Sequence, residues 1–261
     1  MSGTPRIRSF LKSHFGYDEF RPLQEDIIQT VLDKKDCLVL MPTGGGKSLC
    51  FQLPSLIMGG TTLVVSPLIA LMKDQVDALT AHGISAAYLN SSLTLREQRD
   101  VYERASRGQI KLLYVAPERF AVSEFKTLIR EIQIQLVAID EAHCISEWGH
   151  DFRPEYRNLK QVRHLLPGIP VIALTATATQ RVREDIVAQL ALGGSPQFVG
   201  SFNRANLHYT VLPKTDSAQR IFKLLRKHAG EPVIIYCFSR NGTESLAAKL
   251  VAEGFDALPY H

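Results

Sequence analysis

The sequence feature that most constrains the fold is an apolar run followed by three glycines, a lysine and a serine, CLVLMPTGGGKS at residues 37–48. The glycines at 44–46 lack Cβ atoms, so the backbone there can curl its N–H groups around an anion. A helix that begins near Lys47 points its positive end into the same hollow. This order of strand, glycine-rich turn and helix is typical of a phosphate-binding P-loop.

The residues after the glycines supply the chemistry that a nucleotide needs. Lys47 provides a point charge for the outer phosphates, and the Ser48 hydroxyl can join the coordination shell of Mg²⁺. Met41 stands where the strict G-x-x-x-x-G-K-[ST] pattern has its first glycine. The alternative is therefore an ordinary strand, turn and helix that carries a lysine by chance. The pattern predicts a site for a nucleoside triphosphate.

Short apolar runs alternate with helical patterns along the middle of the chain. Continuous apolar strands interleaved with helices are typical of a parallel sheet that is covered on both faces. We therefore expect an α/β fold of the P-loop NTPase class. Pro54 should kink or end the helix that follows the P-loop. The expected strands are 62–66, 86–89, 111–116, 135–139 and 170–174, and the expected helices include 68–79, 95–107 and 124–130.

An acidic pair, Asp140 and Glu141, follows the strand expected at 135–139. The carboxyl ends of parallel strands form the edge where an open α/β sheet binds its ligand, and the P-loop belongs to the same edge. The two motifs should therefore face each other. Asp140 would hold Mg²⁺, mostly as a second-sphere partner of Ser48, and Glu141 would orient the attacking water. The alternative is a solvated acidic turn.

Two aromatic segments leave two interpretations open. In LKSHFGYDEFRPLQ, residues 11–24, Gln24 could pair with an adenine edge and Tyr17 could stack on it, but residue types alone favour a hydrophobic plug. A helix should open at Pro22. In CISEWGHDFRPEYRNL, residues 144–159, aromatics recur every four residues; they could stack unpaired bases or belong to the core.

Composition sets limits on the class of protein. With 261 residues, 45% of them hydrophobic, the chain can build one large core or up to two domains, and its net charge of +4 permits a polyanionic partner without indicating one. No apolar run approaches the ~20 residues of a membrane span, and the first residues lack the apolar core of a signal peptide. The four cysteines contain no C-x-x-C pair and form no zinc set, and three of them stand in apolar surroundings. We expect reduced core thiols of a cytosolic protein at Cys37, Cys50, Cys144 and Cys237.

Taken together, the motifs resemble the front part of a RecQ-family DNA helicase of superfamily 2. The 11–24 segment is similar to the family's L-x3-F-G-x3-F-R-x2-Q pattern, which implies an adenine pocket. MPTGGGKS is the family's form of the P-loop, and DEAH at 140–143 resembles its Walker B box. The remaining similar segments are VVSPLIALMKDQ (64–75) and YVAPER (114–119), which contact single strands in the family, TATA (175–178), which links hydrolysis to domain movement, and the DNA-sensing loop at 144–159.

The resemblance implies a set of site residues. The implied catalytic residues are Lys47, Asp140, Glu141 and His143. The implied ATP-contacting residues are Tyr17, Arg21, Gln24, Thr43, Gly44, Gly45, Gly46, Lys47 and Ser48, and Ser48 and Asp140 are the implied Mg²⁺ residues. The implied DNA-contacting residues are Lys73, Gln75, Arg119, Trp148, Phe152 and Arg153. For Tyr156 a core role and a base-stacking role stay equally open.

The resemblance also implies an activity, an ATP-dependent 3′ to 5′ DNA helicase of DNA repair and recombination. Its implied partners are single-stranded DNA, 3′-tailed or branched duplexes and, through other regions, single-strand-binding protein or further repair proteins. The implied location is the cytoplasm, at the bacterial nucleoid. The alternative is a nucleotide- and DNA-binding module with little turnover. A P-loop kinase or GTPase lacks support, because the N-x-x-D guanine motif is absent.

The expected domain organisation has three parts. Residues 1–196 form a RecA-like ATP-binding domain, 197–216 an interdomain linker, and 217–261 an incomplete second RecA-like domain. In the last two parts we expect strands at 207–212 and 233–239 and helices at 218–228 and 244–253. In the family, the arginine that reaches the γ-phosphate belongs to a later motif, so we expect this chain to hydrolyse ATP weakly.

Overall fold

The computed structural model describes residues 4–201 and 206–261. The chain divides into two compact units, Met1–Arg204 and Ala205–His261. Residues 202–205, in the middle of the expected linker, lie outside the described residues. The two units are described separately below as the first unit and the second unit.

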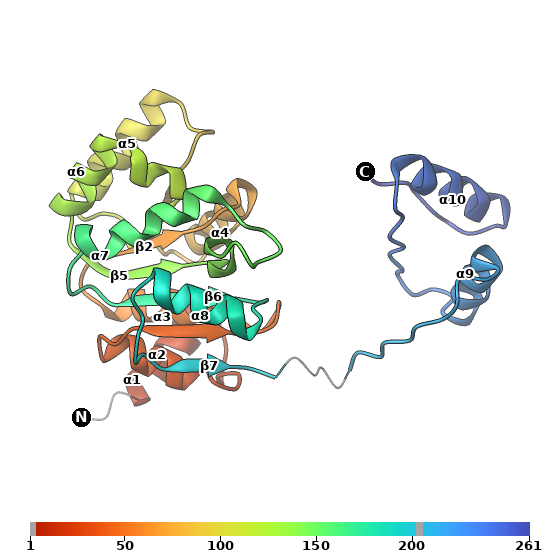
Figure 1. Ribbon diagram of the computed structural model, residues 1–261, viewed down its shortest axis with the longest axis horizontal. Helices are drawn as coiled ribbons and strands as arrows, with labels where there is room; N and C mark the ends of the chain where they lie inside the picture. Colours follow the sequence, from red (N-terminus) through yellow and green to blue (C-terminus); the bar gives the residue numbers. More distant parts are fainter. Residues whose placement is uncertain (1–3, 202–205) are drawn as a thin grey trace. The chain divides into compact units, whose positions relative to one another are not determined.

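The first unit is built on a seven-stranded parallel sheet with the strand order β3-β4-β2-β5-β6-β1-β7 (Figure 1). The six longer strands, all but the three-residue β7, coincide with the apolar runs of the sequence, and most of their residues are buried. The expectation of a parallel sheet is confirmed. The strands are β1 Cys37–Leu40, β2 Thr61–Val65, β3 Ala86–Leu89, β4 Leu112–Val115, β5 Ile134–Ile139, β6 Val171–Thr175 and β7 Gln197–Val199.

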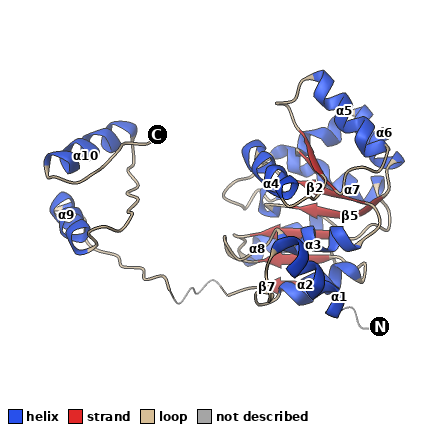
Figure 2. Cartoon of the chain, turned by 180° about the vertical axis from the view of Figure 1, so that it is seen from behind, coloured by secondary structure: helices blue, strands red, loops and turns tan. Residues whose placement is uncertain are grey.

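Helices cover both faces of this sheet (Figure 2). Successive strand residues point to opposite faces, so Val64 packs with α2, α3 and α4, whereas Leu63 and Val65 pack with α5, α6, α7 and α8. No helix in the described ranges is long and apolar enough to cross a membrane. The helices are α1 Thr4–Phe10, α2 Gln24–Leu32, α3 Leu49–Ile57, α4 Ile69–Ala81, α5 Leu95–Ser106, α6 Ser123–Glu131, α7 Val162–Leu165 and α8 Gln180–Gln189.

Two helix boundaries differ from the sequence expectation. Helix α2 begins at Gln24 rather than at Pro22, because Leu23 has a left-handed backbone with φ of 70°. Helix α3 continues through Pro54 to Ile57, so the proline does not end it. The buried side chains of Phe51 and Leu53 hold this helix against the core, and tertiary packing can outweigh the local cost of a proline.

Strand β7 corrects the expected linker. Its residues pair in parallel with β1, Leu38 opposite Gln197 and Leu40 opposite Val199. Residues 197–199 therefore belong to the first sheet, although the sequence analysis assigned them to the linker. A three-residue edge strand has no periodicity of its own, and its partner lies far away in the sequence, so only pairing in space defines it.

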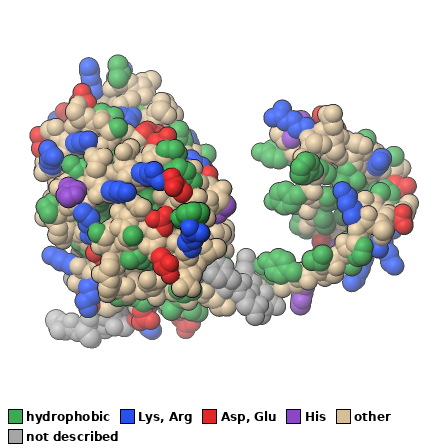
Figure 3. Space-filling view, viewed as in Figure 1, with side chains coloured by type: hydrophobic (Ala, Val, Ile, Leu, Met, Phe, Trp, Pro, Cys, Tyr) green, Lys and Arg blue, Asp and Glu red, His purple; other side chains and the backbone are tan. Residues whose placement is uncertain are grey.

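The second unit contains two helices, α9 Ser217–Lys227 and α10 Arg240–Ala252, close to the expected positions. The strands expected at 207–212 and 233–239 do not form within residues 206–261 as described. Ile234, Tyr236 and Phe238 are each at least 80% exposed, and hydrophobic side chains are visible on the surface of this unit (Figure 3). The prediction of a buried strand at 233–239 is wrong for this chain, because a strand needs a neighbouring strand for its backbone hydrogen bonds.

The four cysteines are free thiols, as the sequence analysis expects. Cys37, Cys50 and Cys144 are buried, whereas Cys237 is half-buried in the second unit. The prediction of core thiols is therefore confirmed for the three cysteines of the first unit and wrong for the fourth.

Candidate functional site

The P-loop connects β1 to α3, and its conformation depends on its glycines. Gly44 and Gly46 have φ of 75° and 83°, in the left-handed region that favours glycine. A Cβ atom on Gly46 would lie 2.3 Å from Gln24 Nε2, so a side chain here would displace the Gln24 amide. Lys47 Nζ donates to the carbonyls of Met41 (3.1 Å) and Pro42 (3.4 Å). The lysine is thus held over the loop that should cradle phosphates.

A cavity of about 490 Å³ unites the P-loop with the acidic pair. It is lined by the 15–24 segment, by the P-loop and α3, by α4 and by the end of β5. Gly45 is absent from the lining. The predicted residues that line the cavity are Tyr17, Arg21, Gln24, Thr43, Gly44, Gly46, Lys47, Ser48, Asp140 and Glu141, joined by residues such as Gln52, Leu71 and Gln75. The structure therefore brings the two motifs to one site.

The segment before α2 is bonded to the P-loop. Gln24 is only 2% exposed; its Oε1 accepts from the Arg21 backbone N–H (2.8 Å), and its Nε2 donates to the Gly46 carbonyl (3.0 Å). The Arg21 guanidinium donates to the Gly44 carbonyl. Phe15 and Phe20 pack against the core as a plug would, whereas Tyr17 is 57% exposed at the cavity. The segment thus combines a packed side with a polar side that faces the cavity.

Asp140 and Glu141 are adjacent carboxyl groups with different environments. Burial, followed by the charge of Glu141, raises the pKa of Asp140 from 3.8 to about 6. A hydrogen bond with His143 is the main cause that lowers the pKa of Glu141. Glu141 has φ of 47°, an uncommon conformation for a residue with a side chain, and its N–H donates to Asp140 Oδ1 (3.0 Å). Glu141 is therefore the carboxyl group that is ionised more readily.

His143 joins the acidic pair to the neighbouring strand β6. Its Nδ1 lies 3.2 Å from Glu141 Oε2 and 2.8 Å from Thr175 Oγ1, at the end of β6. Its ring stacks on His150, with centroids 4.6 Å apart and planes 11° from parallel. The DEAH segment and the TATA segment are thus in direct contact through one buried side chain.

The structure shows a polar network that the sequence analysis missed. Gln75, which the resemblance assigns to DNA contact, lines the same cavity as the P-loop. Its Oε1 accepts from Tyr114 Oη (2.8 Å), and its Nε2 lies 3.5 Å from Ser48 Oγ. Gln52 Nε2 donates to Tyr114 Oη (3.2 Å). Helices α3 and α4 and strand β4 supply these residues, so no sequence spacing could have indicated the network.

The aromatic loop, residues 144–159, has a buried part and an exposed part. Tyr156 is fully buried, and its hydroxyl donates to the Asp140 carbonyl (2.9 Å), so its open alternative resolves in favour of the core. Trp148 is 58% exposed, and the Arg181 guanidinium lies 3.2 Å from the centre of its ring. Phe152 is half-buried, with Arg157 near its ring. Of the three aromatic residues Trp148, Phe152 and Tyr156, only Trp148 and Phe152 are in contact with solvent.

The basic residues implied for DNA contact all have partners within the protein. Arg153 donates to the Pro67 carbonyl (3.0 Å) and to Asp151 Oδ2 (3.2 Å), and it thereby joins the aromatic loop to the segment after β2. Arg119 donates to the Asn90 carbonyl (2.7 Å) and to Gln98 Oε1 (3.0 Å). Lys73 forms an exposed ion pair with Asp77 (2.6 Å). Arg119 therefore has a structural role that the motif does not indicate.

Comparison with known proteins identifies the family of the chain. The family model of the DEAD/DEAH box helicases matches residues 21–186. The chain is 48% identical over 257 residues to an ATP-dependent DNA helicase RecQ of Haemophilus influenzae, covering 98% of this chain and 42% of the relative. It is 42% identical over 261 residues to the ATP-dependent DNA helicase RecQ of Bacillus subtilis, covering 98% of this chain and 44% of the relative. The chain thus spans about two fifths of the length of these curated relatives.

Solved structures show the same fold at low sequence identity. The DUF1998 helicase MrfA superposes with a TM-score of 0.67 at 19% identity, covering 95% of this chain and 40% of that chain. The Mycobacterium smegmatis helicase Lhr, bound to single-stranded DNA and AMP-PNP, superposes with a TM-score of 0.65 at 20% identity. The match covers 96% of this chain and 36% of that chain. The resemblance to RecQ helicases inferred from the motifs is confirmed by sequence identity. This chain belongs to the DEAD/DEAH box helicase family.

Proposed function

We propose that this chain is the ATP-hydrolysing front part of a RecQ-type DNA helicase that moves 3′ to 5′ along single-stranded DNA. The observation that carries the proposal is the cavity in which Lys47 and Ser48 meet Asp140 and Glu141. A phosphate-binding loop opposite two carboxyl groups is the arrangement that hydrolysis of a nucleoside triphosphate requires. The identity of 42–48% to RecQ helicases supports DNA as the polymer.

The site residues suit ATP with Mg²⁺. Mg²⁺ prefers oxygen ligands, and the Ser48 hydroxyl and the Asp140 carboxylate are oxygen donors that line one cavity. Asp140 is a buried carboxyl group whose ionised form lacks a full compensating charge, as its raised pKa indicates, and a divalent cation would supply that charge. When bound, Mg²⁺ neutralises charge on the phosphate oxygens. Ser48 and Asp140 would hold it.

Each protein side chain then has a role in hydrolysis. Lys47 lies over the P-loop and would contact the outer phosphates. Glu141, whose pKa is lowered, remains a carboxylate that can accept a proton from water and orient it for attack. His143 positions Glu141 and contacts Thr175, so a movement of the TATA segment would shift the DEAH segment. Gln24 and Tyr17 would recognise adenine.

The proposal extends to the wider role of the protein. We infer that the substrates are 3′-tailed or branched duplexes and that the process is DNA repair and recombination. The inferred partners are single-strand-binding protein or other repair proteins. The inferred location is the cytoplasm, at the bacterial nucleoid. The names and identity of the bacterial relatives support these inferences. The alternative is a nucleotide- and DNA-binding module with little turnover.

The test of the proposed chemistry is Glu141→Gln. The amide keeps the size of the side chain but loses the carboxylate that orients water, so we expect ATP to bind at near-normal affinity while hydrolysis falls by about 100-fold or more. Phosphate release with and without single-stranded DNA, together with equilibrium ATP binding, measures both effects. Glu131→Gln, at the exposed end of α6, is the matched control. Turnover of Glu141→Gln at the parent rate would remove Glu141 from the reaction.

A further inference from the structure

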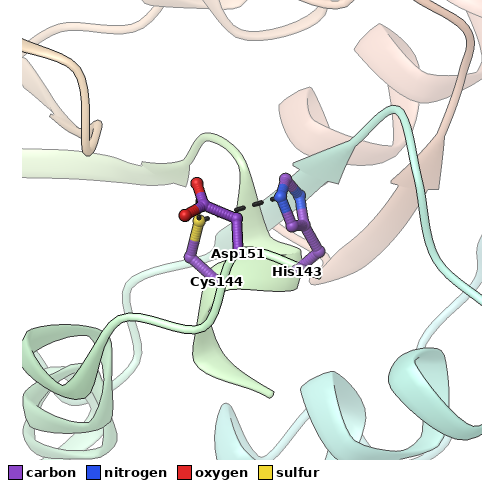
Figure 4. Close-up of side chains that lie close together, drawn as sticks. All are labelled: His143, Cys144 and Asp151. Atoms are coloured by element: carbon purple, nitrogen blue, oxygen red, sulfur yellow. Dashed lines mark hydrogen bonds between the residues drawn. The ribbon is translucent and has the colours of Figure 1, made fainter. Parts of the chain in front are cut away.

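Three side chains with metal-binding atoms meet where the DEAH segment runs into the aromatic loop (Figure 4). Cys144 Sγ lies 3.8 Å from His143 Nε2 and 3.7 Å from Asp151 Oδ2, and all three donor atoms lie within 4.8 Å of one another. Among the residues that the structure describes, this is the one cluster of three or more such side chains. None of the roles proposed above uses Cys144 or Asp151.

The two distances from the Cys144 sulfur suit a tetrahedral ion, and the third separation, between the donor atoms of His143 and Asp151, is at most 4.8 Å. With metal–sulfur bonds of about 2.3 Å and metal–nitrogen or metal–oxygen bonds of about 2.0–2.1 Å, Zn²⁺ separates its ligand atoms by about 3.4–3.6 Å. The distances from the sulfur, 3.8 Å to nitrogen and 3.7 Å to oxygen, exceed these values by only a few tenths of an ångström. Small rotations of the side chains would close that difference.

His143 Nδ1, the ring nitrogen that faces away from the cluster, already has hydrogen-bond partners, as in zinc-binding histidines. Such a histidine usually gives its other ring N–H to a carboxylate, a carbonyl or water, which fixes the tautomer and turns the free nitrogen toward the metal. In this chain Nδ1 lies beside Glu141 Oε2 (3.2 Å) and Thr175 Oγ1 (2.8 Å), while Nε2 faces the Cys144 sulfur. The imidazole is therefore oriented without the metal.

The cluster is also accessible from one side. His143 and Cys144 are buried, whereas the Asp151 side chain is about half exposed. Arg153 donates to Asp151 Oδ2 from Nη2 (3.2 Å) and from Nε (3.4 Å), so the carboxylate is held in place beside the sulfur. An ion could enter at the Asp151 side and replace part of this contact.

We propose that His143 Nε2, Cys144 Sγ and the Asp151 carboxylate form a binding site for a thiophilic divalent cation, Zn²⁺, with water as the fourth ligand. As the sulfur–metal bond forms, the thiol proton leaves to solvent. The site differs from the expected Mg²⁺ site in its ligands, because sulfur and imidazole select zinc over magnesium. It joins the DEAH segment to the aromatic loop through one ion.

A bound ion has a predictable consequence that rests on the proposed function. His143 also contacts Glu141 and Thr175, so an ion on Nε2 restrains the residue that positions the water-orienting carboxylate. Asp151 lies between Trp148 and Phe152 in the loop that should sense DNA. We therefore expect Zn²⁺ to suppress the stimulation of ATP hydrolysis by DNA.

The experiment measures metal binding without ATP, so it does not depend on the proposed function. The full 261-residue chain, reduced and freed of metal, is titrated with Zn²⁺ in excess Mg²⁺ against a chromophoric chelator, and Co²⁺ reports a thiolate-to-metal absorption band. Cys144→Ser and Asp151→Asn remove one ligand each. Cys237→Ser, in the second unit, is the matched control.

The expected result is one equivalent of Zn²⁺ in the parent and in Cys237→Ser, and binding at least about 10-fold weaker in both ligand variants. The cobalt band should vanish in Cys144→Ser. Asp151→Asn changes a half-exposed side chain, so it tests the site even where Cys144→Ser folds poorly. Equal Zn²⁺ affinity in the parent and Asp151→Asn overturns the site. Zn²⁺ that binds as expected but leaves DNA-stimulated hydrolysis unchanged overturns only its link to the DEAH segment.

Discussion

Asp140 and Glu141 show how two identical kinds of group acquire different roles at the scale of single residues. Asp140 is buried at the end of β5, and burial raises its pKa to about 6. Glu141 is half-buried, and its hydrogen bond with His143 lowers its pKa. Neighbouring carboxyl groups with pKa values moved apart are a common arrangement of catalytic sites. Asp140 is thereby suited to a cation, and Glu141 to water.

The raised pKa of Asp140 predicts a pH-dependent gain in stability for Asp140→Asn. Below pH 3.8 the carboxyl group is protonated whether the chain is folded or unfolded, so it costs nothing. As the pH rises from 3.8 through about 6, the unfolded state ionises first, and the folded state loses stability relative to it. One pKa unit corresponds to about 1.4 kcal/mol, so the cost above pH 6 is about 1–3 kcal/mol. Asp140→Asn removes this cost.

Thermal unfolding of the Mg²⁺-free chain at pH 4 and pH 8 measures this effect. We expect Asp140→Asn to melt at a higher temperature than the parent at pH 8, with a smaller difference at pH 4, while ATP hydrolysis is lost. Asp74→Asn, an exposed carboxylate on α4, is the control. A lower melting temperature for Asp140→Asn at pH 8 would mean that the buried carboxylate stabilises the fold.

We expect the Tyr156 hydroxyl to stabilise the fold and to hold the DEAH segment in position. Tyr156→Phe leaves the Asp140 carbonyl without the hydroxyl that donates to it at 2.9 Å, and an unsatisfied buried acceptor costs about 1–2 kcal/mol. We expect a lower free energy of unfolding by that amount in urea titrations, and slower ATP hydrolysis. Tyr88→Phe, at a half-buried position on β3, should change neither quantity. Equal effects of the two substitutions would assign Tyr156 to packing alone.

At the scale of elements, the first unit depends on contacts between segments that are distant in the sequence. The 11–24 segment reaches the P-loop through Gln24, and the aromatic loop reaches the segment after β2 through Arg153. Strand β6 reaches the DEAH segment through Thr175. Each of these contacts joins two elements at the carboxyl edge of the sheet, where the nucleotide cavity lies.

Gln24→Ala tests the contact between the 11–24 segment and the P-loop. We expect discrimination for ATP over GTP to fall about 10-fold, or about 1.4 kcal/mol, while phosphate affinity is largely kept. Equilibrium binding of both nucleotides measures the ratio, and Gln29→Ala on α2 is the control. The structure also provides a competing outcome, because Gln24 Nε2 donates to the Gly46 carbonyl. An equal loss of affinity for ATP and GTP would mean that Gln24 supports the loop and does not recognise the base.

At the scale of the whole molecule, the two units differ in how completely they bury apolar surface. The first unit has a sheet covered on both faces. The second unit exposes Ile234, Tyr236 and Phe238. Its Phe222, in α9, stacks on Phe255, which follows α10, with the ring centroids 6.1 Å apart. Exposed apolar side chains on a backbone without strand partners make a segment sensitive to proteases and prone to aggregation.

We therefore expect the 261-residue chain to bind ATP, to hydrolyse it feebly and not to unwind DNA. Unwinding needs two domains that close and open on a strand, and residues 206–261 as described contain no sheet for a second domain. An arginine that contacts the γ-phosphate raises the rate of ATP hydrolysis by about 10³–10⁵. In the resembled family this arginine belongs to a later motif. Unwinding of a 3′-tailed duplex is measured for this chain and for one extended to the length of its RecQ relatives. A comparable rate for the short chain would contradict the expectation.

The sequence by itself determined the features that depend on local chemistry. Three glycines, a lysine and a serine after an apolar run specify the P-loop, because backbone freedom and charge are properties of those residues. Continuous apolar runs specify the buried parallel strands for the same kind of reason. The facing of Lys47 and Asp140 also followed, since parallel strands present their carboxyl ends at one edge.

Only the tertiary structure decided the features that depend on partners far along the chain. Tyr156 is a core residue whose hydroxyl donates to the Asp140 carbonyl, and Gln75 lines the cavity beside the P-loop, where Tyr114 and Ser48 lie beside its amide. Residues 197–199 formed a strand because β1 was there to pair with them, and 233–239 formed none because residues 206–261 as described provide no such neighbour. The hydrogen bond and the packing contact need two segments, and a linear pattern records only one.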